Sequence, residues 1–229
     1  MSYQWLLFDA DNTLFDFDRT MEHALEAAMQ HAGLPFETNF HQIYQEINHQ
    51  CWSDFEHGKI TKTELRTLRF SLFFEAIEVE YASDVFEISY LNYLSQGAFL
   101  IDGAQALLEE LHGEFRIGLV TNGLKEVQRP RLAKSGLQHY FDVVVVSDEI
   151  GHAKPHAAFF DHAFAEMRHS RRDEVLMIGD NLNADIKGAA DYGLDTCWYN
   201  PQQLPNELDV QPTYQIDTLT SLSVLLSKE

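Results

Sequence analysis

The sequence is poor in cysteine and has no long apolar segment. Its two cysteines, Cys51 and Cys197, lie far apart among 229 residues. Because no basic segment followed by an apolar one opens the chain, we expect both to be free thiols in a protein of the reducing cytoplasm. No apolar run approaches the roughly 18 residues that a membrane-spanning helix needs, so we expect no membrane partner.

Basic residues are also scarce. The chain has 16 lysines and arginines against 36 acidic residues, which gives a formal net charge of −20. Nucleic-acid polymers are bound by clustered Lys and Arg, so this balance argues against them as partners. A small phosphorylated metabolite is still compatible, because a local site can hold it against the overall field. Nothing in the sequence fixes the oligomeric state.

The first apolar run of the chain ends in two carboxylates. Trp5 to Phe8 is too short for a helix and is typical of a buried parallel strand, and Asp9 and Asp11 follow it. Residues two apart in an extended segment point to the same side, so the two carboxylates are expected to share one site. Such a pair needs a cation, a shared proton or an electrophile nearby.

The next part of the chain has only helical periodicity. Apolar residues recur at helical spacing over 20–32, 40–80 and 83–94, and Thr61 with Glu64 forms a plausible capping box. We therefore expect an all-helical domain over 16–96, inserted into a second domain made of 1–15 and 97–229.

From Phe99 onward, helices and strands alternate. The predicted strands are 116–120, 143–146, 175–178 and 196–199, the predicted helices are 103–111, 127–135, 157–167 and 184–192, and a short strand and closing helix occupy 214–228. This alternation is typical of an α/β fold with a doubly wound parallel sheet covered on both faces. In such sheets ligands bind at the carboxyl ends of the strands.

Each predicted strand runs into residues that suit a phosphate or a metal. These residues are Thr121, Asn122 and Gly123 after the second strand, Lys154 after the third, and Asp180 and Asp185 after the fourth. If they converge, the site contains four Asp, one Lys and one Thr. Four carboxylates beside a single lysine would repel one another strongly, and a hard divalent cation such as Mg²⁺ would relieve this.

These segments also carry a family resemblance. Asp9-Ala10-Asp11-Asn12-Thr13, Thr121-Asn122-Gly123, Lys154-Pro155 and Gly179-Asp180 with Asp185 resemble the four ordered motifs of haloacid-dehalogenase-like (HAD) phosphohydrolases. The resemblance implies a Rossmann-like core with a helical cap. Asn12 stands where that family often has Gly, and Asn is the residue after Gly that best tolerates a left-handed backbone.

The resemblance implies a role for each of these residues. Asp9 would be the nucleophile that forms an aspartyl-phosphate, and Asp11 the general acid and base. Thr121, Asn122, Gly123 and Lys154 would bind the phosphate. Mg²⁺, for which Mn²⁺ would substitute, would be held by Asp9, the Asp11 carbonyl and Asp180, with Asp185 in contact through water or through Lys154.

Within the family, the opening motif and the segments Gly58–Thr61 and Asp195–Trp198 look most like cytosolic pyrimidine 5′-nucleotidases of the YjjG type. The implied substrates are dUMP, UMP and dTMP. The aromatic residues of the helical segment are expected to form mostly its core, with one or two rings free to stack on a base: Trp52, Phe55, Phe70, Phe73 and Phe74.

Other functions stay open at this point. A phosphomutase, or a phosphatase for phosphoglycolate or a sugar phosphate, would use the same motifs. Dehalogenases of the family lack the second Asp, so Asp11 argues against that chemistry. A phospho-receiver module also combines an acidic pair, Thr and Lys around Mg²⁺, but its phosphoacceptor is an Asp after the third strand. Here Ser147 holds that position.

Overall fold

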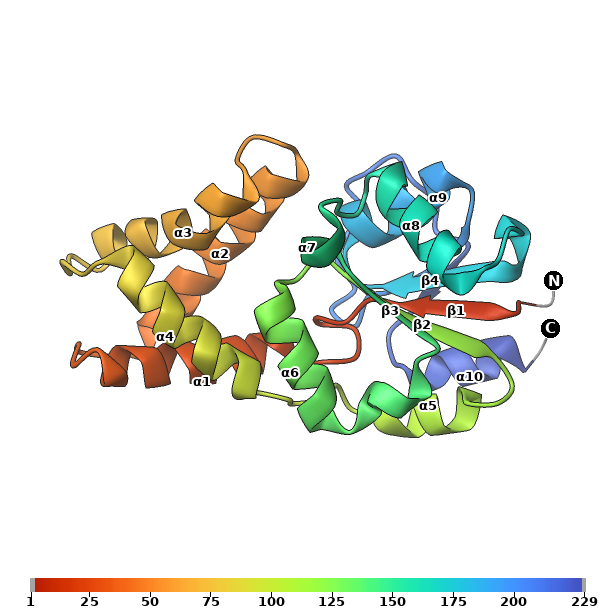
Figure 1. Cartoon of the computed structure of the whole chain (residues 1–229), viewed down its shortest axis with the longest axis horizontal. Coiled ribbons are helices and arrows are strands. Elements are labelled where there is room, and N and C mark those ends of the chain that lie inside the picture. The colour runs from red at the N-terminus through yellow and green to blue at the C-terminus, as the bar shows by residue number, and fades with distance from the viewer. Residues whose placement is uncertain (1–2, 228–229) are drawn as a thin grey trace. The chain divides into compact units, whose positions relative to one another are not determined.

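The computed structural model describes residues 3–227. Its sheet has six parallel strands in the order β3-β2-β1-β4-β5-β6. Figure 1 labels β1, β2, β3 and β4 of this sheet. The strands are β1 (Trp5–Phe8), β2 (Arg116–Thr121), β3 (Val143–Val146), β4 (Val175–Gly179), β5 (Asp195–Tyr199) and β6 (Tyr214–Ile216). The order reverses between β1 and β4, and this is the position where a doubly wound sheet binds its ligand.

Helices cover both faces of the sheet, which confirms the predicted fold class. Alternate side chains of β1 point to opposite faces. Leu6 and Phe8 pack with apolar residues of α5 (Ala104–Leu111), α6 (Lys125–Ser135) and α10 (Thr220–Leu226). Trp5 and Leu7 pack with those of α8 (Ala157–Met167) and α9 (Gly188–Tyr192). The central strand is therefore buried on both sides, as its uninterrupted apolar sequence predicts.

Short elements complete the sheet unit, and some of them differ from the sequence expectation. A one-turn helix, α7 (Ser147–Ile150), directly follows β3, and 3₁₀ turns form at η1 (Leu137–Tyr140) and η2 (Arg172–Glu174). The helix predicted over 184–192 begins earlier, as the π-helical turn η3 (Leu182–Lys187), and continues as α9. Single turns carry too few residues to produce a periodic pattern, so the sequence could not reveal them.

The segment 17–97 consists of helices and the loops that join them. It forms α1 (Phe17–His31), α2 (Asn39–Glu56), α3 (Lys62–Ala76) and α4 (Ser83–Gln96). The predicted capping box is confirmed, because the Thr61 side chain accepts from the Glu64 backbone and the Glu64 side chain accepts from Thr61 N. Buried aromatic rings of α2, α3 and α4 form the interior: Phe40, Tyr44, Phe70, Phe73, Phe74, Phe86 and Tyr90.

The chain divides into two compact units, residues 1–16 with 98–229 and residues 17–97. The first unit contains the sheet, and the second is the helical unit. Asn12 has φ of +57°, so the left-handed backbone expected at this position is present. Within residues 3–227, no helix is long and apolar enough to cross a membrane.

Candidate active site

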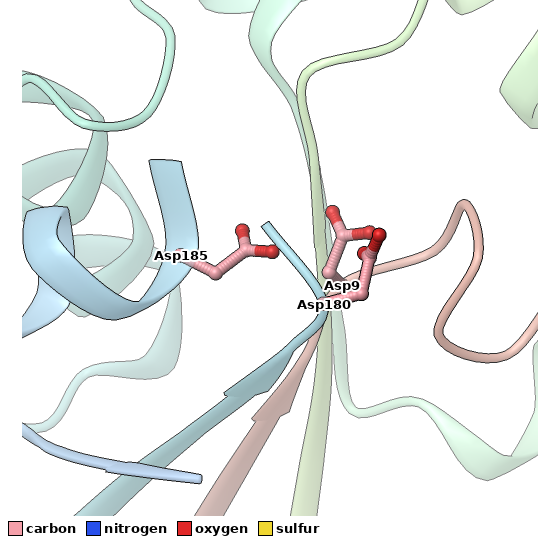
Figure 2. Close-up of side chains that lie close together, drawn as sticks. All are labelled: Asp9, Asp180 and Asp185. Carbon is pink, nitrogen blue, oxygen red and sulfur yellow. The ribbon is translucent and has the colours of Figure 1, made fainter. Parts of the chain in front are cut away.

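Two neighbouring strands bring the first carboxylates together. Phe8 of β1 lies opposite Ile178 of β4, and the Asp9 backbone N–H donates to the Ile178 carbonyl at 2.9 Å. Asp9 and Asp180 therefore leave the sheet side by side, and Asp185 of η3 points toward them (Figure 2). Carboxylate oxygens of these three residues lie within 4.8 Å of one another.

Glycine at the end of β4 allows this approach. A Cβ on Gly179 would lie 2.2 Å from an oxygen of Asp185, so any other residue would displace that side chain. The Asn181 backbone N–H donates to Asp185 Oδ2 at 3.1 Å and fixes the carboxylate in place. The convergence of Asp9, Asp180 and Asp185, which the strand ends predict, is thus present in the structure.

Lys154 lies between two of the carboxylates. Its Nζ is 2.5 Å from Asp9 Oδ1 and 2.7 Å from Asp185 Oδ1, and it donates to the Val120 carbonyl at 2.7 Å. The Asn122 side chain holds the lysine backbone from both sides, because it accepts from Lys154 N at 2.8 Å and donates to Lys154 O at 2.9 Å. Asn122 thus positions the lysine in this structure.

The electrostatics reflect an excess of buried negative charge. Burial raises the pKa of the Asp9 carboxyl to about 7, although Lys154 opposes the shift. Burial and the neighbouring Asp9 and Asp185 raise the pKa of Asp180 well above its ordinary value. For Lys154, burial alone would lower the pKa, but Asp185 and Asp9 outweigh it and raise the pKa.

The charge balance matches a divalent cation. Ionised Asp9, Asp180 and Asp185 carry three negative charges, and Lys154 supplies one positive charge. The remainder of two negative charges, presented only by oxygen atoms, fits a hard ion such as Mg²⁺. The raised carboxyl pKa values of Asp9 and Asp180 have the same cause, because burial encloses a cluster in which negative charge exceeds positive charge.

Two residues that the sequence reasoning did not single out hold Asp180. The Thr13 hydroxyl donates to Asp180 Oδ1 and accepts from Asp180 N, both at 3.1 Å. Trp198 Nε1 donates to the Asp180 carbonyl at 2.9 Å. Thr13 belongs to the opening motif, so the sequence could have indicated its role. The contact of Trp198 could not be predicted in this way, because it depends on the pairing of β5 with β4.

The turn after β2 is held by hydrogen bonds of its own residues and of α7. Thr121 is buried, and its Oγ1 accepts from the Gly123 backbone N–H at 3.1 Å. The Ser147 hydroxyl donates to the Asn122 carbonyl at 2.9 Å and ties the loop to α7. A Cβ on Gly123 would lie 2.2 Å from Nε2 of Gln128, so only glycine fits here without moving that side chain.

Asp11 differs from the other three carboxylates. Its side chain lies outside their cluster and is bound by helix α6, where Arg131 Nη1 donates to Oδ1 at 2.5 Å and Gln128 Nε2 to Oδ2 at 2.6 Å. The expectation of four carboxylates beside a single lysine is therefore wrong, because Arg131 is a second cation. Gln128 and Arg131 are three residues apart on the helix that follows the second motif, so they lie on the same helix face. This spacing is the sequence feature from which the contact with Asp11 could have been predicted.

Comparisons with known proteins identify the family of this chain. The family model for haloacid dehalogenase-like hydrolases matches residues 3–193. The chain belongs to the haloacid dehalogenase-like hydrolase family. The matched range contains all four motifs and the inserted helical unit.

Members of this hydrolase family resemble the chain over its full length. It is 35% identical to pyrimidine 5′-nucleotidase YjjG of Escherichia coli (strain K12), with 100% of both chains covered. It is 36% identical to pyrimidine 5′-nucleotidase PynA of Streptococcus pneumoniae (strain ATCC BAA-255 / R6). This alignment covers 100% of the present chain and 97% of PynA.

A solved structure of the family matches the whole fold. The crystal structure of the HAD-hydrolase YfnB from Bacillus subtilis, bound to magnesium, is 37% identical in sequence. It superposes with a TM-score of 0.95 and covers 99% of both chains. The fold of this chain is thus that of a HAD hydrolase.

Proposed function

We propose that this chain is a Mg²⁺-dependent phosphoric monoester hydrolase that works through an aspartyl-phosphate on Asp9. The observation that carries the proposal is Asp9 itself. It is a buried carboxylate at the switch point of the sheet, and a lysine ammonium lies 2.5 Å from one of its oxygens. A positive charge beyond those of Lys154 and Arg131 would make this cluster of carboxylates compatible with an incoming phosphate.

Each residue has a task in this reaction. Asp9 attacks phosphorus, and the bond to the leaving oxygen breaks. Asp11 gives that oxygen a proton, and later takes one from the water that attacks phosphorus, breaks the Asp9–phosphorus bond and releases phosphate. Thr121 and the turn that follows bind the non-bridging oxygens, and Lys154 balances their charge. Asp9, Asp180 and the Asp11 carbonyl would hold Mg²⁺, which supplies charge neutralisation when bound, and Asp185 would act through Lys154.

The metal part of the proposal is tested by chelation and readdition. Mg²⁺ should restore activity, and so should Mn²⁺, which accepts the same oxygen ligands. Ca²⁺ should not, because its larger and looser shell would misplace Asp9. Asp180→Ala should raise the Mg²⁺ concentration needed for half-maximal activity more than Asp185→Ala does. Full activity in excess chelator would refute the metal assignment.

For the substrate, we propose pyrimidine nucleoside 5′-monophosphates such as dUMP, UMP and dTMP. The support comes from the names of two full-length relatives, YjjG and PynA. The helical unit adds a physical argument, because Trp52 and Phe55 are only partly buried. Partly exposed rings are the ones able to stack on a base, whereas Phe70, Phe73 and Phe74 are buried within the unit.

The experiment is a competition among phosphorylated metabolites at equal concentration, read as released phosphate. We expect dUMP, UMP or dTMP to have a kcat/KM clearly above that of purine monophosphates, phosphoglycolate and hexose phosphates. Release without a bisphosphate activator separates a phosphatase from a phosphomutase. If phosphoglycolate or a sugar phosphate is preferred, the hydrolase assignment stands and the nucleotidase proposal is wrong.

A further inference from the structure

Helix α6 holds both oxygens of the Asp11 carboxylate. Arg131 contacts Oδ1 and Gln128 contacts Oδ2, at 2.5 and 2.6 Å. A carboxylate with a donor on each oxygen cannot change its rotamer without breaking a charge-assisted hydrogen bond. Asp11 is 26% exposed and would otherwise be free to turn toward solvent.

The arginine is built into the core for this contact. Its side chain is 0% exposed, and its guanidinium lies 4.8 Å from the centre of the Phe15 ring. A buried arginine is costly unless an acid compensates its charge, and Asp11 supplies that acid. Phe15 in turn is fixed by the opening loop, because its carbonyl accepts from Asn12 N at 2.7 Å.

Gln128 connects the same carboxylate to the turn after β2. Its side chain is buried and lies against Gly123, where even a methyl group would collide with it. One face of α6 therefore contacts both the acid that follows β1 and the loop that follows β2. These contacts lie entirely within the unit that contains the sheet.

We infer that Arg131 and Gln128 are positioning residues that set the Asp11 carboxyl group, protonated on a lone pair that neither donor occupies, for proton transfer to the leaving oxygen. The inference rests on the proposed function, in which Asp11 is the general acid. Preset side chains are how enzymes keep reacting groups within a fraction of an ångström of their working positions. Neither residue touches the phosphate in this account, so neither is a catalytic residue.

The inference has a signature that a purely structural role lacks. Proton donation matters for a poor leaving group, such as the sugar 5′-oxygen of a nucleotide, and matters little for p-nitrophenolate. The ratio kcat/KM reports the steps up to leaving-group departure from the free enzyme and substrate. Misplacing Asp11 should therefore lower kcat/KM for dUMP far more than for p-nitrophenyl phosphate.

The experiment compares Arg131→Met, Arg131→Lys and Gln128→Met with both substrates. We expect Arg131→Met to lose about 10²-fold in kcat/KM on dUMP and less than about threefold on p-nitrophenyl phosphate. Arg131→Lys keeps a cation within reach of Asp11 and should recover about tenfold on dUMP. Gln128→Met removes one of the two hydrogen bonds and should lose about tenfold on dUMP alone.

The matched control is Arg129→Met on the same helix. Arg129 pairs with Glu149 at 2.6 Å on the exposed face, and its loss should leave both substrates unaffected. Circular dichroism and thermal melting identify any variant that does not fold. Because Arg131→Lys keeps the buried charge, it stays informative if Arg131→Met unfolds.

Asp11→Asn separates failure of the inference from failure of the proposed function. If Asp11→Asn loses activity selectively on dUMP and the Arg131 variants do not, the positioning role is wrong and the general acid stands. Equal losses on both substrates in the Arg131 variants would also overturn it. If Asp11→Asn shows no selectivity, or the wild type hydrolyses neither ester, the proposed function fails and the inference fails with it.

Discussion

The two units of the molecule both bury charged side chains but balance them differently. In the helical unit, buried Glu87 pairs with Arg66 at 2.6 Å, and buried Arg69 donates to Asn48 at 3.0 Å. At the carboxyl edge of the sheet, the Lys154 ammonium contacts two carboxylates, and the Asp180 carboxylate accepts from the Thr13 hydroxyl. A buried charge that keeps a partner is compatible with a stable fold, whereas a concentrated imbalance of charge is typical of a binding site.

The interiors differ in the same sense. Arg69 lies over the rings of Phe70 and Tyr90, at 4.9 and 5.5 Å, within a cluster of packed aromatic residues. These rings attract the guanidinium and offset part of the cost of burying its charge. The comparison therefore predicts that changes at the sheet edge alter activity and pH behaviour, and that changes inside the helical unit alter stability.

The largest expected effect is that of Asp9→Asn. The substitution keeps the size of the side chain and removes the attacking charge, so kcat should fall by at least about 10³-fold. Thermal melting should show that the fold is intact. Near-normal turnover by a correctly folded variant would refute the aspartyl-phosphate mechanism and the functional side of the comparison.

The second prediction concerns the helical interior. Phe70 is fully buried and packs within 5.5 Å, between ring centres, of Tyr44, Phe86 and Tyr90. Phe70→Ala should lower the free energy of unfolding by about 3–5 kcal/mol, measured by urea denaturation. Leu72→Ala, on the same helix at a position that is 39% exposed, should cost under about 1 kcal/mol. Similar costs for both variants would contradict the assignment of these rings to the core.

The sequence predicted the sheet edge better than the details that surround it. Asp9, Asp180, Asp185 and Lys154 follow strands, and parallel strands bring their carboxyl ends together, so their convergence follows from chain order. Arg131 was missed because the buried face of a helix is recognised by its apolar residues, and a buried arginine looks like a surface residue in sequence.

The third prediction uses the raised carboxyl pKa values of the metal-free protein. The pKa of Asp9 is about 7 against an ordinary value of 3.8, so the folded state favours its protonated form. The stability this contributes is complete below the ordinary pKa and is lost as pH rises through 7. In excess chelator, the melting temperature should therefore fall as the pH rises from about 4 to about 8, because Asp9 and Asp180 lose their protons over this range.

Asp180→Asn removes one of the two buried carboxyl groups and should restore part of the stability that the wild type loses at high pH. At pH 8 without metal, the variant should be more stable than the wild type by roughly 1–3 kcal/mol, with a smaller difference at pH 4. Adding Mg²⁺ should remove the wild-type pH slope and leave the variant nearly unchanged. Asp209→Asn, at an exposed position, is the control and should match the wild type throughout. A wild type whose metal-free stability rises over this range would contradict the imbalance at the sheet edge.

The smallest expected effect belongs to the capping box of α3. Thr61 and Glu64 satisfy each other's backbone N–H groups at the start of this helix, at exposed positions of the helical unit. Thr61→Ala should lower the free energy of unfolding by about 1 kcal/mol, because one N–H of the first turn loses its acceptor. Glu64→Ala should cost a similar amount, and the double variant should cost less than the sum, since both hydrogen bonds belong to one motif.

Neither change should alter kcat/KM for p-nitrophenyl phosphate. A loss of activity in Thr61→Ala at unchanged stability would show that the helical unit takes part in the chemistry. It would contradict the view that the sheet edge determines activity and the helical unit determines only stability.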